Sequence, residues 1–127
     1  RQSRTSIERL NGTSAFDRVF SRGGGIRGEG SKLVYLRNNL GYSRFAVCPV
    51  RTYGTAVERN RAKRLAREAY RTLHDRLEPG YDLVFVVYPG SDTFAERCDQ
   101  LNRLCRKARL VAHREPQSSY RQMSREK

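Results

Sequence analysis

The chain has 127 residues, of which 37% are hydrophobic, and it carries a formal net charge of +13 with a pI near 10.5. This length suits a single domain with a modest core, and the charge favours association with an anionic polymer. No apolar run approaches membrane-spanning length, and the basic segment lacks the Trp- and Phe-rich face of a membrane-surface helix. Nucleic acid is therefore the expected partner, and a membrane is not.

The three cysteines predict neither a disulfide framework nor a zinc site. Their number is odd, and no Cys-x-x-Cys pair occurs among Cys48, Cys98 and Cys105. Cys98 and Cys105 are seven residues apart on an expected helix, so they share a face and act as small core residues. Free thiols favour a reducing compartment, and a cytoplasmic location is expected.

The first part of the chain predicts an arm, a short helix and a loop. Residues 1–12 are polar and basic and are expected to form an N-terminal arm. A helix is expected from Thr13 or Ser14, and a flexible glycine-rich loop follows it through Gly28 and Gly30. The apolar side of this helix is expected to carry Phe16, Val19 and Phe20.

A β-hairpin is expected next. Residues 32–37 and 44–50 are rich in strand-forming residues, and they flank the turn sequence Asn-Asn-Leu-Gly at 38–41. Two such segments around a turn predict an antiparallel hairpin. Pro49 is expected to weaken the pairing near the end of the second strand, because proline has no amide hydrogen to donate.

The middle of the chain predicts a long helix and a buried strand. Thr55 and Glu58 have the spacing of a capping box, which starts the helix, and the helix is expected to run to about Asp75. Residues 81–88 form a nearly continuous apolar run of strand length. Such a run is typical of a strand that is buried on both faces of a sheet.

A final helix, capped by Ser91 or Thr93, completes the predicted domain. Residues 112–127 are polar and lack periodicity, so they are expected to form a C-terminal tail after a single nucleic-acid-binding domain at 13–111. The element order indicates an α/β (α+β) fold, with helices packed on one small sheet. The core-facing stripe of the last helix is expected to be Phe94, Cys98, Leu101, Leu104, Cys105 and Ala108.

The helix that starts after Thr55 combines a dense group of cations with an apolar stripe. Guanidinium groups suit phosphate oxygens and stack on bases. Cations three or four residues apart repel each other, and a bound polyanion relieves that repulsion. A solvated face that only keeps the protein soluble is the alternative. The residues expected to meet nucleic acid are Arg59, Asn60, Arg61, Lys63, Arg64, Arg67 and Arg71, opposite a stripe of Ala62, Leu65, Ala66, Ala69 and Leu73.

Three aromatic residues have two interpretations. Phe16 and Phe20 are one helical turn apart, and Tyr35 lies on the first expected strand. Aromatic residues at helical spacing usually belong to the core. Alternatively, these rings line a groove on which unstacked bases lie, as is common in RNA recognition.

Catalysis by the protein's own side chains is not expected. Only two histidines occur: His74 lies at a helix end and His113 in the polar tail. The glycine run at 23–25 has neither the preceding strand nor the following Lys-Ser/Thr of a nucleotide-binding loop. We therefore predict no catalytic residue and no metal-ligating residue.

The region around residues 59–68 (Arg-Asn-Arg-Ala-Lys-Arg-Leu-Ala-Arg-Glu) closely resembles the protein component of bacterial ribonuclease P. The likeness covers roughly residues 8–110 and includes the Pro-Gly-Tyr-Asp-Leu-Val-Phe-Val-Val segment at 79–87. It implies a small two-layer α/β sandwich with an unusual left-handed βαβ crossover through the cationic helix. Handedness statistics alone would predict the opposite hand.

The resemblance also implies a function. The family's catalytic RNA performs the magnesium-dependent endonucleolytic removal of the 5′ leader of precursor tRNA, so the implied partners are that RNA and precursor tRNA. No obligate protein partner is evident. Magnesium would be held mainly by the RNA subunit and the substrate, and the cations at 59–71 would contact the catalytic RNA. The residues implied to bind the single-stranded leader are Phe16, Phe20, Tyr35 and Arg51.

One segment departs from the family pattern. Residues 48–52 read Cys-Pro-Val-Arg-Thr where members of the family usually have a Ser-x-Ser-Lys-Lys-like run, and only Arg51 keeps a cation. Two other classes of protein are alternatives to the family of the resemblance. A structural RNA-binding protein, such as a ribosomal protein, would share the charge without a leader groove. A DNA-binding regulator would need a helix–turn–helix partner for the cationic helix, and none is evident.

Overall fold

The computed structural model describes residues 8–10, 12–90 and 92–111. Most of the expected N-terminal arm, the whole expected C-terminal tail with His113, and the alternative cap Ser91 lie outside these ranges. The elements in chain order are α1 (Thr13–Arg22), β1 (Gly24–Gly28), β2 (Ser31–Arg37), β3 (Arg44–Pro49), α2 (Ala56–Leu73), a 3-10 turn (His74–Arg76), β4 (Tyr81–Val87) and α3 (Phe94–Lys107).

The four strands form one mixed sheet in the order β1-β2-β4-β3. β2 is antiparallel to β4, and β3 is parallel to β4. The predicted hairpin between the segments at 32–37 and 44–50 is therefore wrong, because β4 lies between them. The reason is burial: β4 is apolar along its length, with Asp82 to Val87 all buried, and a central position covers both of its faces.

The glycine-rich segment after α1 is a strand, which corrects the expectation of a flexible loop. β1 pairs antiparallel with β2, with Gly24 opposite Tyr35. A Cβ atom on Gly24 would lie 2.9 Å from the ring of Tyr35, and one on Gly23 would lie 2.5 Å from the carbonyl oxygens of Tyr35 and Val19. The absent side chains thus allow close packing, which composition alone does not reveal.

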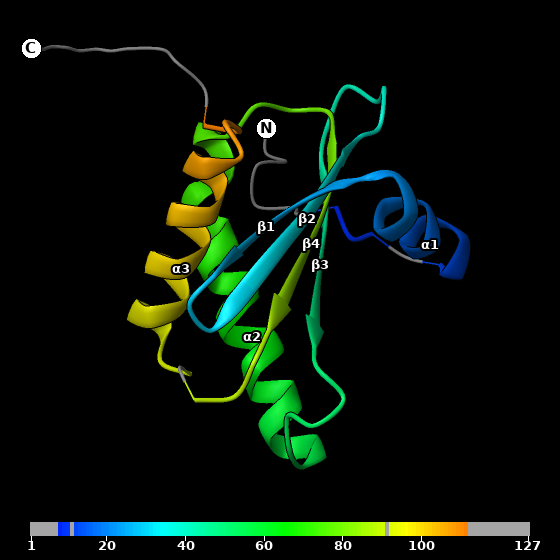
Figure 1. Ribbon diagram of the computed structural model, residues 1–127. Coiled ribbons are helices and arrows are strands. Elements are labelled where there is room, and N and C mark those ends of the chain that lie inside the picture. The colour runs from blue at the N-terminus through cyan, green and yellow to red at the C-terminus, as the bar shows by residue number, and fades with distance from the viewer. Residues whose placement is uncertain (1–7, 11, 91, 112–127) are drawn as a thin grey trace, which may run out of the picture.

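Helices cover both faces of the sheet, but unequally (Figure 1). α2 and α3 pack against each other and against one face, where the larger core contains Leu33, Phe45 and Phe85. α1 packs on the opposite face, over β2 and β4, where the smaller core contains Val19 and Val84. The expected class, a small mixed sheet with helices packed on it, is confirmed.

The parallel strands β3 and β4 are joined through α2 in a βαβ unit. In Figure 1 both strands run downward, β4 lies to the left of β3, and α2 returns upward behind the sheet. This arrangement is a left-handed crossover, as the resemblance implied and against the usual statistics.

The predicted capping box at the start of α2 is present, and α3 starts with a second one at Thr93, one of its two predicted caps. Thr55 Oγ1 accepts from Glu58 N at 3.2 Å while Glu58 Oε1 accepts from Thr55 N at 2.8 Å. Thr93 and Glu96 form the same pair at the start of α3. The stripe predicted for α3 is correct except for Phe94, the first residue of the helix, which is exposed.

The weakened pairing predicted at Pro49 is not seen. Pro49 ends β3, yet Val50 N still donates to Val87 O at 3.1 Å, so pairing continues past the proline. The missing amide hydrogen of Pro49 is tolerated because β3 is an edge strand.

Residues 8–10 of the expected arm pack against the sheet: Leu10 N donates to Phe45 O at 3.1 Å, and Leu10 is buried. Among the residues described, no helix is both long and apolar enough to cross a membrane.

Candidate nucleic-acid interface

The cationic helix α2 buries one side and exposes the other. Its inward side packs in the larger core through Ala62, Ala66, Ala69, Tyr70 and Leu73. Asn60, Arg61, Arg64 and Arg71 are exposed, and Lys63 and Arg67 are half-buried. The predicted division into an apolar stripe and a cationic face is therefore correct, although Leu65 is only half-buried.

Arg59 differs from the other cations of α2. Its Nη1 donates to Val50 O at 2.7 Å and to Arg51 O at 3.4 Å, and its Nη2 donates to Pro49 O at 3.3 Å. These bonds satisfy carbonyl groups at the end of β3 and fix the first turn of α2 against that strand. Arg59 thus positions the cationic face, and its guanidinium is less free to meet a ligand than those of Arg61 and Arg64.

Arg67 lies where α2 meets the edge of the sheet. Burial lowers the pKa of Arg67, and the nearby positive charge of Arg9 lowers it further. Arg71, one turn later, has Glu68 Oε2 at 3.9 Å, with about half of each side chain exposed. This exposed pair contributes little to stability. No other cation of α2 has a carboxylate within ion-pair distance among the described residues, so most of the charge on α2 is not neutralised there.

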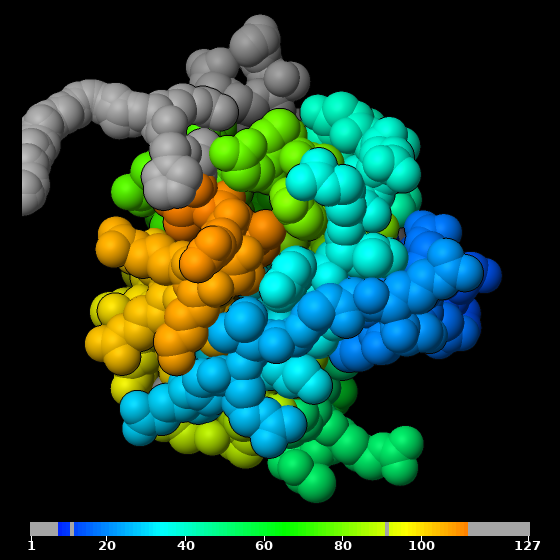
Figure 2. All heavy atoms as spheres, turned by 45° about the horizontal axis from the view of Figure 1, so that its top comes forward, coloured from blue at the N-terminus to red at the C-terminus, as the bar shows by residue number. Residues whose placement is uncertain are grey.

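A second candidate surface is the half of the sheet that α1 leaves uncovered. Phe16 packs on the smaller core, together with Cys48, Val50 and Tyr88, which are all half-buried. Phe20, on the same side of α1, is 46% exposed. Tyr88 was not among the predicted site residues. It is two residues after Val86 and four after Val84, so strand geometry places all three on this face. The space-filling view shows a recess between α1 and the loop that leads into α2 (Figure 2).

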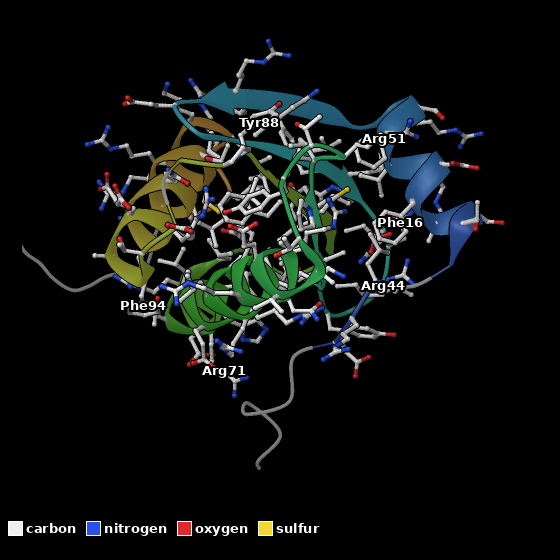
Figure 3. All side chains as sticks on the ribbon, turned by 90° about the horizontal axis from the view of Figure 1, so that it is seen from below. Phe16, Arg44, Arg51, Arg71, Tyr88 and Phe94 are labelled. Carbon is white, nitrogen blue, oxygen red and sulfur yellow. The ribbon has the colours of Figure 1, made fainter. Side chains whose placement is uncertain are left out.

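Tyr35 is not part of this surface. It packs against the larger core, on the face that α2 and α3 cover, whereas its neighbour Val34 faces α1. The structure therefore brings Phe16 and Phe20 together and separates Tyr35 from them. Strand alternation puts Lys32, which is half-buried, on the α1 side with Val34. Arg51 is exposed in the loop after β3 (Figure 3).

A buried carboxylate lies on β4, near α1. Asp82, which is fully buried, accepts from Arg44 Nε at 2.8 Å, from Arg44 Nη2 at 2.7 Å and from Asn38 Nδ2 at 2.9 Å. Arg18 of α1 lies 3.9 Å away. Burial by itself raises the pKa of Asp82, but these hydrogen bonds and charges outweigh it, so the pKa lies below its ordinary value.

A buried arginine fixes the other end of the uncovered face. Arg97 of α3 is fully buried, and its Nη2 donates to Tyr88 O at 2.9 Å and to Tyr53 Oη at 2.8 Å. Its Nη1 donates to Gly30 O at 3.1 Å. One side chain therefore connects the start of β2, the end of β4 and the loop before α2.

The described residues do not gather a group of three or more histidine, cysteine or carboxylate side chains that could ligate a metal. His74 lies at the end of α2, with Nδ1 3.4 Å from Asp75 Oδ1. The carboxylate of Glu58 is used by its capping box, and those of Glu68 and Asp75 face Arg71 and His74. These carboxylates therefore interact with groups of α2 and of the 3-10 turn that follows it.

Together these features define a class: a small α/β protein with a cationic helix on one side and a partly uncovered sheet face on the other. A family model described as Ribonuclease P matches residues 5–109. The Ribonuclease P protein component of Petrotoga mobilis is 40% identical over 79 residues, covering 62% of this chain and 67% of the relative. That of Dehalococcoides mccartyi is 32% identical over 117 residues, covering 89% of this chain and 94% of the relative.

Solved structures of ribonuclease P proteins have a similar fold. The ribonuclease P protein of Thermotoga maritima superimposes with a TM-score of 0.69 at 28% identity, covering 78% of this chain and 96% of that one. That of Staphylococcus aureus has a TM-score of 0.75 at 17% identity, covering 84% and 100%, and shows the shared fold. The chain belongs to the ribonuclease P protein family. It is a protein component of ribonuclease P, which places it in tRNA processing rather than among ribosomal proteins or DNA-binding regulators.

Proposed function

We propose that this protein binds the catalytic RNA of ribonuclease P and the single-stranded 5′ leader of precursor tRNA. In this role it assists the magnesium-dependent endonucleolytic removal of the leader, while the RNA subunit makes and breaks the bonds. The observation that carries the proposal is the exposed cationic face of α2, whose arginines outnumber nearby carboxylates in a chain of net charge +13.

The catalytic RNA is proposed to contact that face. Arg61 and Arg64 are exposed and point away from the core, and Asn60 adds a donor and an acceptor beside them. The N-terminal amides of α2 add partial positive charge at the same end. Arg59 positions this surface through its hydrogen bonds to backbone carbonyls at the end of β3. These cations offset the repulsion between ribozyme and substrate, which otherwise requires a high concentration of magnesium.

The leader is proposed to lie on the uncovered sheet face beside α1. Phe16, Phe20 and Tyr88 offer aromatic surface there, and Lys32 and Arg51 offer positive charge for the phosphates. Stacking of a base on an aromatic ring tolerates any base, as a leader of variable sequence requires. Tyr88 and Lys32 replace Tyr35 in this proposal, because Tyr35 packs on the opposite face.

Magnesium is proposed to be held by the RNA subunit and the substrate. The protein would act on it indirectly, because cations that share the neutralisation of phosphates lower the concentration of magnesium that the RNA requires.

Reconstitution tests the proposed function. With a bacterial ribonuclease P RNA at low magnesium, adding the protein should restore leader removal and should favour precursor over mature tRNA by about tenfold or more. The magnitude follows from stacking, which contributes roughly 1–3 kcal/mol per base. Leader removal is measured by gel, and both affinities by titration of the reconstituted enzyme. Equal affinity for the two tRNAs would contradict the leader site, and no gain in cleavage would contradict the whole proposal.

Replacing Phe20 separates leader binding from stability. Phe20 is 46% exposed, so Phe20→Ala should change the free energy of unfolding by less than about 1 kcal/mol. The affinity of the reconstituted enzyme for precursor tRNA should nevertheless fall by about fivefold or more, through the lost stacking. The matched control is Phe94→Ala, which removes a ring that is 43% exposed on α3. If both variants bind precursor tRNA alike, Phe20 is not a leader residue.

A further inference from the structure

The guanidinium group of Arg97, on α3, is enclosed in the protein without a counter-charge. The side chain is fully buried, and among the described residues no carboxylate lies within ion-pair distance of it. Its hydrogen bonds go to neutral acceptors, of which Gln100 Oε1, one turn later on α3, accepts from Nη1 at 2.8 Å. A buried charge without an opposite charge is costly, and an apolar side chain of similar size often replaces such a group without loss of stability. Stability alone therefore does not explain an arginine at this position.

Two of the hydrogen bonds of Arg97 fix the backbone of Tyr88, the residue that follows β4. Gly30 O accepts from Tyr88 N at 3.1 Å and from Arg97 Nη1 at 3.1 Å, and Tyr88 O accepts from Arg97 Nη2 at 2.9 Å. The carbonyl of Tyr88 is thus bonded to the guanidinium directly, and its amide is connected to the same group through Gly30. Because the two peptide groups beside a Cα atom set the direction of its side chain, Arg97 sets how the ring of Tyr88 lies on the uncovered sheet face.

The same nitrogen atom of Arg97 also holds the loop between β3 and α2. Arg97 Nη2 donates to Tyr53 Oη at 2.8 Å, and Tyr53 is 5% exposed. Tyr53 N in turn donates to Val50 O at 2.9 Å, which closes the turn that contains Arg51. Tyr88 O and Tyr53 Oη therefore accept from one atom, so the end of β4 and the turn with Arg51 are held at a fixed separation.

We propose that Arg97 is a positioning residue for leader binding. By holding Tyr88 O and Tyr53 Oη on one nitrogen, it fixes the ring of Tyr88 relative to the turn that carries Arg51. The inference rests on the proposed function and deepens it, because it names the group that keeps the leader surface in shape before the RNA binds. A surface that is ordered in advance binds its ligand without the cost of ordering. Arg97 itself is buried and does not contact the leader.

Arg97→Met tests the proposal, because it removes the charge and the hydrogen bonds but keeps an unbranched side chain in the same space. In the reconstituted enzyme, the affinity for precursor tRNA should fall by about fivefold or more, since the stacking of a base on the ring of Tyr88 is weakened. The affinities for mature tRNA and for the catalytic RNA should not change. The control Arg106→Met removes an exposed arginine of α3 and should leave all three affinities unchanged. A general loss of structure weakens the binding of precursor and mature tRNA alike, and that result would overturn the proposal.

A combination of variants shows whether Arg97 acts through Tyr88. In a Tyr88→Ala background, Arg97→Met should lower the affinity for precursor tRNA much less than it does in the unmodified protein, because the ring that it positions is already absent. In a Phe20→Ala background the two losses should add, since the ring of Phe20 lies on α1 and shares no hydrogen bond with Arg97. If the losses from Arg97→Met and Tyr88→Ala also add in full, Arg97 does not act through Tyr88 and the proposal is wrong.

Tyr53→Phe repeats the test if Arg97→Met does not fold. It deletes one acceptor of Arg97 and keeps the buried ring, and it should lower the affinity for precursor tRNA by about twofold or more without changing that for mature tRNA. An unmodified protein that binds precursor and mature tRNA equally would contradict the proposed function itself. A preference for precursor tRNA that both Arg97→Met and Tyr53→Phe leave intact would contradict only the role of Arg97.

Discussion

Asp82→Asn should lower the free energy of unfolding by about 3 kcal/mol at pH 7 and the melting temperature by roughly 10 °C. Asp82 is fully buried and accepts a two-fold hydrogen bond from Arg44, so its loss leaves a guanidinium without its counter-charge. The effect lies at the low end for a broken buried pair because the Arg44 side chain is 24% exposed to water. Calorimetry or denaturant unfolding measures it.

The pH dependence of stability should identify the same carboxylate. Because the folded-state pKa of Asp82 is lowered, its contribution is complete above its unfolded-state pKa, near 4, and is lost as the pH falls through the lower folded-state value. The unmodified protein should therefore lose stability steeply below about pH 4, and Asp82→Asn should lose less over that range. The same acid dependence in both proteins would show that Asp82 is not the group that titrates.

A matched control and a functional readout complete this experiment. Asp99→Asn breaks an exposed pair in which Arg103 Nε lies 3.2 Å from the carboxylate, and it should change stability by less than about 1 kcal/mol. Arg18 of α1 lies 3.9 Å from Asp82 and its side chain is 48% exposed, so this contact is weak and the Asp82 variant should bind precursor tRNA with nearly unchanged affinity at temperatures where it remains folded. A clear loss of affinity would show that the contact positions α1.

Replacing Arg61 and Arg64 together by alanine should weaken binding to the catalytic RNA by at least about a hundredfold. Each lost charge-assisted contact contributes about 1.5–3 kcal/mol, and the salt dependence of log K should fall by about 0.7–0.9 per contact. Both side chains are exposed, and neither forms a hydrogen bond or ion pair within the described part of the chain. Stability should therefore change by less than about 1 kcal/mol, and the loss of affinity would come from the RNA contacts themselves.

The control for this pair is a second double variant that has the same net charge as the Arg61 and Arg64 variant. Replacing Arg27 of β1 and Arg106 of α3 by alanine also removes two exposed cations, but away from α2. If this variant binds RNA as weakly as the Arg61 and Arg64 variant, total charge governs the interaction and the cationic face of α2 has no special role. Filter binding over a range of salt concentrations provides both the affinity and its salt dependence.

Local sequence patterns predicted most of the elements correctly. The helices α1, α2 and α3, the capping box of Thr55 with Glu58 and the cap at Thr93 depend on interactions within a few residues of each other. The apolar run that becomes β4 is also a local pattern, although its neighbours in the sheet bury it. The choice of strand partners depends on the whole chain instead. The turn at 38–41 favoured a local hairpin, but inserting β4 between β2 and β3 buries β4 on both faces and stabilises the sheet more.

Some residues of the candidate site could likewise be predicted from local patterns, and others could not. The cationic face of α2 follows from helical periodicity, and the structure exposes it as expected. Tyr35 was misplaced because facing alternates along a strand, and a shift by one residue moves a side chain to the other face. The roles of Arg9 and Arg59 depend on β3, whose carbonyls and edge hold both residues, and no local pattern indicates those contacts.

The charge, the helices and their caps, the apolar character of β4 and, through the residues at 59–68, the family can all be read from the amino-acid sequence. The strand order, the pairing of β1, the face on which each aromatic ring lies and the closeness of Arg9 to Arg67 become visible only in the folded protein. The physical reason is the range of the interactions. Caps and helical faces arise between neighbours in the chain, whereas strand order and the facing of side chains arise from burial between segments that come together only in the folded protein.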